Sequence, residues 1–215
     1  MTPTDADVRD ALQEAGRAVL SRRLTWGASG NISARTAPDT FVISASGTAL
    51  GYLRHDLLVE CDLEGNVLFG TARPSVERML HASVYRARQD VGAILHASPL
   101  YITLVACSDL EIDSAISTDT AYYLPTVARV AFYPPSSGEL ANAVASAAAE
   151  SDAVLLQNHG AVTFGYTLGD VVLRMECLEM LCHMLVVQKM GFPLAPLNTW
   201  QVETLTEYLA VDKNP

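Results

Sequence analysis

Apolar residues recur at helical spacing in six stretches of the chain. In the first stretch, Val8, Leu12 and Ala15 stand three or four positions apart, which is typical of a helix with one buried face. Ser136 stands three residues before Glu139, and this spacing predicts a capping box at the start of an Ala-rich helix. We expect helices over residues 5–24, 73–90, 99–108, 136–151, 168–190 and 201–210.

Short β-prone runs alternate with these helices. The run 57–70 carries Leu-Glu-Gly-Asn between two apolar segments, which is a hairpin signal. Hairpins mixed with helices favour a mixed sheet that is covered by helices on both faces. No linker, repeat or low-complexity segment interrupts the alternation. We expect strands within 26–35, over 40–47, within 57–70, over 91–98 and 128–133, and on either side of a turn in 152–165.

Composition and charge narrow the function classes. The 215 residues carry a formal net charge of −10, which argues against nucleic acid or an anionic membrane as partner. No apolar run has the length of a membrane span, and the polar, acidic N-terminal stretch does not resemble a secretory signal. The four cysteines show no CxxC spacing, so we expect free thiols and a cytoplasmic protein.

Two histidines share one sequence context. His96 and His159 each follow an apolar β run closely, and each stands at a turn. If the two strands are neighbours in the sheet, their ends fall on one edge and the imidazoles converge on a possible metal site. The alternative is that each ring bonds a turn carbonyl, and spacing alone favours this alternative.

A carboxylate precedes these histidines in the chain. Glu77 is expected in the first turn of a helix, just after Pro74 and Ser75, where it could compensate the helix dipole. It could instead act as an acid or base beside a metal. His81 lies four residues on and thus on the same helix face, but this spacing is not the HExxH zinc pattern, so we do not expect His81 to be a ligand.

Three short turns rich in Gly or Ser could hold an anion. Residues 27–31, 44–47 and 73–75 offer backbone N–H groups and hydroxyls, and together they could bind a phosphate or a carboxylate. Each turn taken alone is ordinary. The P-loop and GxGxxG patterns are absent.

Five segments in order resemble one family. They are "SGNIS" (29–33), "ISASG" (43–47), "PSVERMLHASVYRAR" (74–88), "AILHASP" (93–99) and "LLQNHGAVTFG" (155–165). Together they are similar to the class II aldolase/adducin family, whose members include L-fuculose-phosphate aldolase and L-ribulose-5-phosphate 4-epimerase. The likeness extends from about residue 8 to about residue 190.

The resemblance implies a fold, an assembly and a metal. It implies a three-layer α/β/α domain with a central mixed, largely antiparallel sheet, which would span residues 1–215 with a tail from 191. It also implies a homotetramer whose active sites lie between subunits. A divalent cation, commonly zinc but with manganese, cobalt or iron possible, would be held by His96 and His159. Ser98 stands where the family has its other histidine ligand.

The resemblance also implies the remaining site residues. Glu77 matches the catalytic acid/base, and Tyr123 falls near a tyrosine that would serve the adjacent subunit's site as a proton donor. Ala28 and Val76 are apolar where sugar-phosphate aldolases have hydroxyls, which makes a smaller anion such as a carboxylate more plausible. The residues that match the family's phosphate-holding positions are Gly30, Asn31, Ser46, Gly47 and Ser75.

The function implied is that of a metal-dependent carbon–carbon lyase. Such an enzyme would cleave a small hydroxy-carbonyl or sugar-phosphate compound through an enediolate that the cation stabilises as a Lewis acid. Ala28, Val76 and Ser98 favour an alternative, a decarboxylase, dehydratase or epimerase on the same site. A further alternative, favoured by Ser98 alone, is a non-catalytic, adducin-like binding protein.

Overall fold

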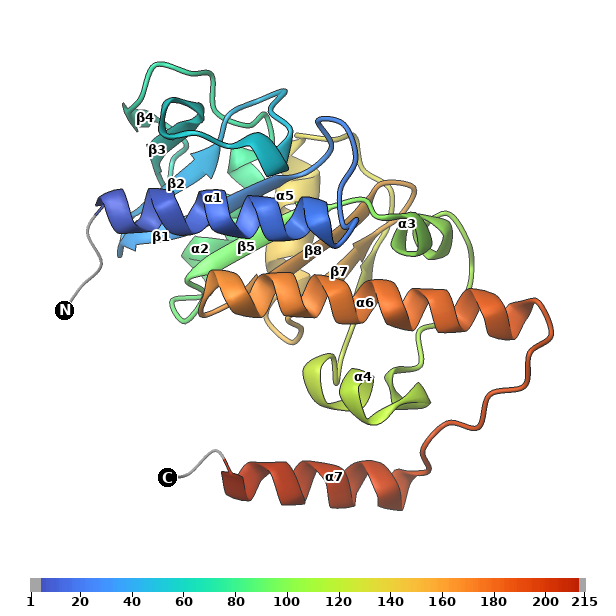
Figure 1. Cartoon of the computed structure of the whole chain (residues 1–215). Helices are drawn as coiled ribbons and strands as arrows, with labels where there is room; N and C mark the ends of the chain where they lie inside the picture. The colour runs from blue at the N-terminus through green and yellow to red at the C-terminus, as the bar shows by residue number, and fades with distance from the viewer. Residues whose placement is uncertain (1–4, 213–215) are drawn as a thin grey trace.

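The computed structural model describes residues 5–212, and its strands form one eight-stranded sheet (Figure 1). The strand order is β4-β3-β2-β1-β5-β8-β7-β6. Every neighbouring pair is antiparallel except β6 and β7, which are parallel. The strands are β1 (Asn31–Ala37), β2 (Thr40–Ser44), β3 (Leu58–Asp62), β4 (Val67–Phe69), β5 (Ala93–Ala97), β6 (Ala128–Val130), β7 (Ala153–Leu156) and β8 (Gly160–Gly165).

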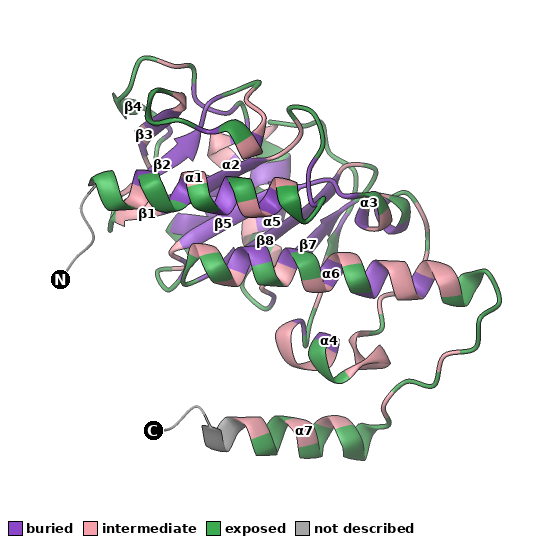
Figure 2. Ribbon diagram, viewed as in Figure 1, coloured by how far each residue is buried: buried purple, intermediate pink, exposed green. Residues whose placement is uncertain are grey.

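Helices cover both faces of this sheet. On one face α1, α3 and α6 share a hydrophobic cluster with the strands, and on the other face α2 and α5 share a second cluster (Figures 1 and 2). The expected three-layer α/β/α fold with a mixed, largely antiparallel sheet is therefore confirmed. The helices are α1 (Asp5–Ser21), α2 (Arg78–Ala87), α3 (Leu100–Ala106), α4 (Thr118–Tyr123), α5 (Gly138–Ala147), α6 (Leu168–Lys189) and α7 (Thr199–Asp212), with 3-10 turns at Leu50–Tyr52, His55–Leu57 and Ser114–Ile116.

The central strand β5 shows how the sequence divides its side chains between the two layers. Every residue of its sequence AILHA is buried. Leu95 packs with α1 and α6, whereas Ile94 packs in the cluster of α2 and α5. Because side chains alternate along a strand, His96 points to the same face as Ile94. His96 therefore stands on the side of the sheet that α2 covers.

Helix α2 begins later than the sequence indicated. Pro74 forms an isolated antiparallel bridge with Ala45, and the N–H of Ser75 donates to the carbonyl of Ser44 over 3.1 Å. This pairing keeps residues 73–75 extended, so the helix starts at Arg78 and not near Pro74. The turns 44–47 and 73–75, which we expect to bind an anion, are thereby paired with each other.

The segment between β6 and α5 also differs from expectation. Strand β6 ends at Val130, before two prolines that cannot donate to a ladder. The N-cap of α5 is Ser137, whose hydroxyl accepts from the N–H of Leu140, so the capping box predicted for Ser136 and Glu139 is wrong. Ser136 is instead a non-glycine residue with a φ of +67°.

One helix lies outside the three layers. Helix α7, predicted over 201–210, runs from Thr199 to Asp212, packs against α4 and stands apart from the sheet (Figure 1).

Within residues 5–212, no helix combines the length and the apolar character that a membrane span requires. The thiols expected from the sequence are free, with Cys61 and Cys182 buried and Cys107 exposed.

Candidate metal centre

His96 is held at the end of β5 by its pairing with β1. Asn31, the first residue of β1, is the register partner of His96. Gly30, the residue before Asn31, has a φ of +85°. A Cβ at Gly30 would lie 2.5 Å from the His96 carbonyl oxygen. Only glycine allows this close approach. The start of β1 and the end of β5 therefore form one edge of the site.

His159 reaches the same edge from the turn between β7 and β8. From the sequence, the meeting of the two histidines was conditional on neighbouring strands, but β8 lies between β5 and β7. Since β8 is antiparallel to both, β5 and β7 run in the same direction and their ends lie on one edge. The two imidazole centroids are 4.7 Å apart, with the rings inclined at 66°.

Glu77 completes the cluster from the residue before α2. It occupies the N-cap position and not the first helical turn, and its side chain makes no capping hydrogen bond, so the alternative in which it caps the helix is wrong. Its carboxylate instead points towards the histidines. Oε2 lies 3.3 Å from Nε2 of His96, and Oε1 lies 3.7 Å from Nε2 of His159. The side chains of Glu77 and His96 are buried, and His159 is half-buried.

These three side chains are arranged to fit a divalent cation. One ligand atom from each of them lies within 4.8 Å of the others. Ligand atoms that surround a tetrahedral zinc ion at its usual bond length are about 3.4 Å apart, so a small closure of the cluster would suffice. Oε1 of Glu77 is buried without a hydrogen-bond partner, and a bound cation would satisfy it.

The ring of His96 combines both roles that its sequence context allowed. Nδ1 lies 2.9 Å from the carbonyl oxygen of Ala161, to which it donates. This bond fixes the tautomer and leaves the lone pair of Nε2 directed at the cluster. A metal-binding histidine usually donates its second nitrogen in this manner. The turn carbonyl and the cation are therefore compatible partners of His96.

The electrostatics of the cluster favour an ionised Glu77 carboxylate and a neutral His159 ring. Burial alone would raise the pKa of Glu77, but His96, the hydrogen bond from Asn31 and His159 together lower it below its usual range. Burial, followed by the proximity of His96, lowers the pKa of His159. A carboxylate and unprotonated imidazoles are the forms that bind a metal.

Ser98 does not join the cluster. Its hydroxyl donates to the main-chain carbonyl of His159 over 2.9 Å, and its own carbonyl accepts from the indole N–H of Trp26 over 3.1 Å. Gly160 makes room for this contact, because a Cβ at that position would lie 2.6 Å from the Ser98 hydroxyl oxygen. Ser98 therefore secures the turn that carries His159.

A cavity of about 280 Å³ opens above the three side chains. The sequence did not single out Pro135 or Ser136 for this cavity, yet both line it, and the only sequence signal was the pair of prolines at 134–135. The apolar Ala28 and Val76 also line it. Every predicted anion-binding residue lines the same cavity, namely Gly30, Asn31, Ser46, Gly47 and Ser75.

Two other residues of interest lie away from the cavity. Tyr123, at the end of α4, is half-buried against the cluster of α1 and α6 and does not line the cavity of its own chain. Its predicted service to an adjacent subunit's site stays a prediction. His81 is fully buried on α2, and burial lowers its pKa to about 3, so it is a neutral core histidine.

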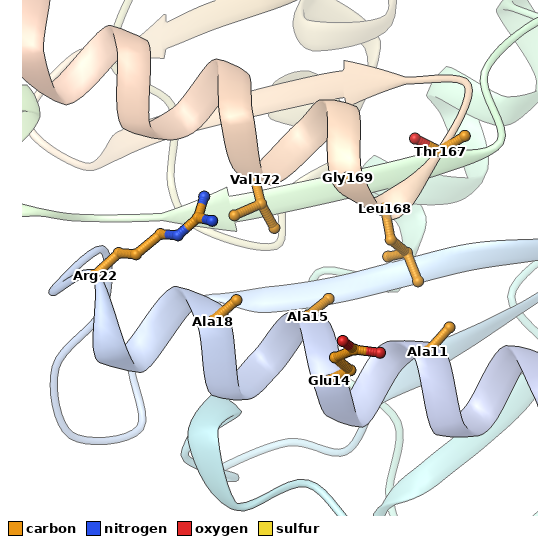
Figure 3. A pocket seen from close by; sticks show the side chains of 9 residues that line it. All are labelled: Ala11, Glu14, Ala15, Ala18, Arg22, Thr167, Leu168, Gly169 and Val172. Carbon is orange, nitrogen blue, oxygen red and sulfur yellow. The ribbon is translucent and has the colours of Figure 1, made fainter.

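A second cavity, of about 450 Å³, lies between α1 and α6 (Figure 3). Its walls are largely apolar or small side chains, among them Ala15, Leu168 and Val172, and its polar lining residues are Glu14, Arg22 and Thr167. It borders the segment that follows β8, whereas the cluster of His96, His159 and Glu77 borders the turn that precedes β8. This larger cavity contains no cluster of metal ligands among the described residues.

Comparison with known proteins assigns the chain to a family. The model of the class II aldolase and adducin N-terminal domain matches residues 10–186. A 3-oxo-tetronate 4-phosphate decarboxylase of Haemophilus influenzae is 33% identical over 82% of this chain and 85% of its own length. An L-fuculose phosphate aldolase of Methanocaldococcus jannaschii is 32% identical over 76% of this chain and 87% of its own length.

A solved structure agrees with this assignment at the level of fold. YgbL from Escherichia coli superposes with a TM-score of 0.85 at 23% identity, covering 92% of this chain and 96% of that one. The chain belongs to the class II aldolase family, and its relatives are enzymes of that superfamily. The resemblance inferred from five short segments is confirmed.

Proposed function

We propose that this protein is a metal-dependent carbon–carbon lyase acting on a small anionic hydroxy-carbonyl compound. The observation that carries the proposal is the meeting of His96, His159 and Glu77 at the floor of a cavity lined by anion-binding turns. Neither half of this arrangement would suffice alone, because a lyase of this class needs both an electrophile and a grip on the substrate.

His96, His159 and Glu77 would hold the cation. When bound, a divalent cation acts as a Lewis acid that draws electron density from a carbonyl oxygen. Zinc suits two imidazoles and a carboxylate, and manganese, cobalt or iron suit the same donors. The unpartnered Oε1 of Glu77 supports this assignment, since a buried carboxylate oxygen requires a positive or hydrogen-bonding partner.

The turns around the cavity would hold the anionic end of the substrate. Gly30 and Gly47 present backbone groups, and Ser46 and Ser75 add hydroxyls. A hydrogen bond to a charged acceptor contributes about 1.5–3 kcal/mol, so a few of them suffice to orient a small substrate. The pairing between residues 44–46 and 73–75 keeps these groups in fixed relation to Glu77.

Glu77 would carry the proton. In aldol cleavage, a base takes the proton from the hydroxyl of the departing fragment while the carbon–carbon bond breaks. The bonding electrons move to the adjacent carbonyl and form an enediolate, which is then protonated at carbon. Glu77 is the only carboxylate among the residues that line the cavity, so it is the residue that fits this role.

Decarboxylation is the second candidate, and the hydrogen bond of Ser98 favours it. Because the Ser98 hydroxyl is directed to the His159 carbonyl, Glu77 is the third available ligand and is less free to move protons. Loss of carbon dioxide from a 3-oxo acid leaves an enolate without removal of a hydroxyl proton. The relative from Haemophilus influenzae, named for such a decarboxylation, supports this alternative.

We also propose a homotetramer in the cytoplasm. Tyr123 does not line the cavity of its own chain, which is consistent with service to a neighbouring subunit. The free thiols support a reducing compartment.

A substrate panel tests the proposal. Metal-free protein would be assayed with and without added zinc, manganese or cobalt on ketose 1-phosphates, 3-oxo acid phosphates and their unphosphorylated forms. We expect turnover that requires a cation and releases either an aldehyde or carbon dioxide. Equal activity with and without metal, or no turnover of any of these compounds, would contradict the proposal.

A further inference from the structure

A hydrogen-bond network of buried polar side chains connects the core to the cluster of His96, His159 and Glu77 on the α2 face of the sheet. The Tyr85 hydroxyl lies 2.8 Å from Ser33 Oγ, and Ser33 Oγ lies 2.7 Å from Nδ1 of His81. Nε2 of His81 lies 2.5 Å from Oδ1 of Asn31. Nδ2 of Asn31 then donates to Oε2 of Glu77 over 3.0 Å.

The direction of every hydrogen bond in this network follows from the Glu77 carboxylate at its end. An ionised carboxylate only accepts, so Asn31 must present its NH2 group to Glu77 and its carbonyl oxygen to His81. His81 must then donate from Nε2, which leaves Nδ1 of a neutral ring to accept from the Ser33 hydroxyl. Ser33 in turn accepts from Tyr85.

The network is buried from solvent, and each of its four side chains has a hydrogen-bond partner. Ser33, His81 and Tyr85 are each 0% exposed, and Asn31 is 6% exposed. Asn31 and Ser33 alternate with Ile32 along β1, so both point to α2, which carries His81 and Tyr85. With all four groups committed, reversal of the Asn31 amide would place two acceptors against each other at Glu77 and two donors against each other at His81.

We propose that His81 is a positioning residue that locks the Asn31 amide, and through it the Glu77 carboxylate, in the orientation that binds the cation. This inference rests on the metal site of the proposed function. Because Asn31 occupies Oε2 of Glu77, Oε1 is the oxygen left without a hydrogen-bond partner and directed at His159. His81 touches neither cation nor substrate, so its effect passes through Asn31 alone.

Cobalt binding separates this role from a merely structural one. We would measure the affinity of metal-free protein for Co²⁺ by calorimetry and record the visible spectrum of the cobalt form, which reports ligand geometry. His81→Phe should weaken cobalt binding roughly 10- to 100-fold, the range typical of residues that orient metal ligands, and should change the spectrum. His81→Gln, whose amide nitrogen can replace Nε2 as donor to Asn31, should restore most of both.

Two further variants serve as controls. His183→Phe removes a half-buried imidazole that stacks on Tyr101 at a centroid distance of 3.8 Å, and it should leave cobalt affinity unchanged. Tyr85→Phe removes the hydroxyl at the far end of the hydrogen-bond network and should weaken cobalt binding less than His81→Phe does. Thermal unfolding of each metal-free variant shows that the protein measured is folded.

The outcomes distinguish this inference from the function on which it rests. If the wild-type protein binds no cobalt, the metal site itself is refuted. If the wild type binds cobalt and a folded His81→Phe binds it equally well with the same spectrum, only the positioning role of His81 is refuted. If His81→Phe does not fold, an affinity for His81→Gln as weak as that of Asn31→Leu would also refute it.

Discussion

The hydroxyl of Ser98 donates a hydrogen bond to the main-chain carbonyl oxygen of His159 over 2.9 Å. Ser98 stands where the family resemblance places a histidine ligand, but in this chain its side chain acts on the backbone of a neighbouring turn. That turn contains Asn158 with a φ of +59°, a conformation that few non-glycine residues adopt. The bond therefore supports a strained turn that presents one imidazole to the cluster.

Removal of the Ser98 hydroxyl should affect stability more than metal binding. We expect Ser98→Ala to lower the free energy of unfolding by about 1–3 kcal/mol, because the partly buried His159 carbonyl loses its partner. Metal affinity should remain near that of the wild type, since no ligand is removed. Chemical denaturation and calorimetry on the same protein samples check both statements, and loss of the metal with unchanged stability would contradict them.

Ser98→His tests whether the site is merely poor in ligands. A third imidazole should raise metal affinity and, if aldol cleavage is the native reaction, should also raise turnover. A fall in activity on the native substrate would show that Ser98 is adapted to different chemistry, such as decarboxylation. Parallel assays on the aldol and 3-oxo acid substrates separate these results.

Val76 offers a test of whether the substrate carries a phosphate. It lines the cavity beside Ser75 and is 42% exposed. Val76→Ser adds a hydroxyl donor, and we expect KM for a phosphorylated substrate to fall about tenfold, which corresponds to one hydrogen bond to a charged acceptor. Val76→Ala is the control for lost bulk, and an equal fall in KM for that variant would contradict this explanation.

Acid should destabilise the metal-free protein through His81. In the unfolded chain its pKa is near 6.5, whereas burial lowers it to about 3 in the folded protein. Between these values the unfolded state binds a proton that the folded state does not, so stability falls as pH falls, by up to ~1.4 kcal/mol per pH unit. Above the unfolded pKa this contribution is fully present.

Urea denaturation between pH 8 and pH 5 measures this dependence. His81→Gln has no group that titrates in this range, so its stability should decline less steeply below pH 6.5 than that of the wild type. Parallel curves for the two proteins would show that the folded protein accommodates a protonated His81.

The sequence predicted the elements well where apolar periodicity was strong. The run before His96 and the long α6 were expected within a few residues of their observed limits. The start of α2 was missed because Pro74 and Ser75 pair with β2, and this tertiary contact overrides a local helix signal. The capping box predicted at Ser136 was wrong because the next serine, Ser137, serves as the cap.

The residues of the candidate site were predictable from the sequence, whereas the contacts between them were not. His96, His159 and Glu77 were chosen from turns and from family likeness, and the structure brings them together. Spacing could not show that β8 lies between the two supporting strands. Nor could it connect His81 to Glu77 through Asn31, since that link depends on the register between distant parts of the chain.

Calorimetric titration of metal-free protein with zinc or manganese tests the central claim most directly. The account predicts one cation per chain, with binding strongly weakened in His96→Ala, His159→Ala and Glu77→Gln and kept in Ser98→Ala. Absence of binding, or binding that survives substitution of both histidines, would contradict it.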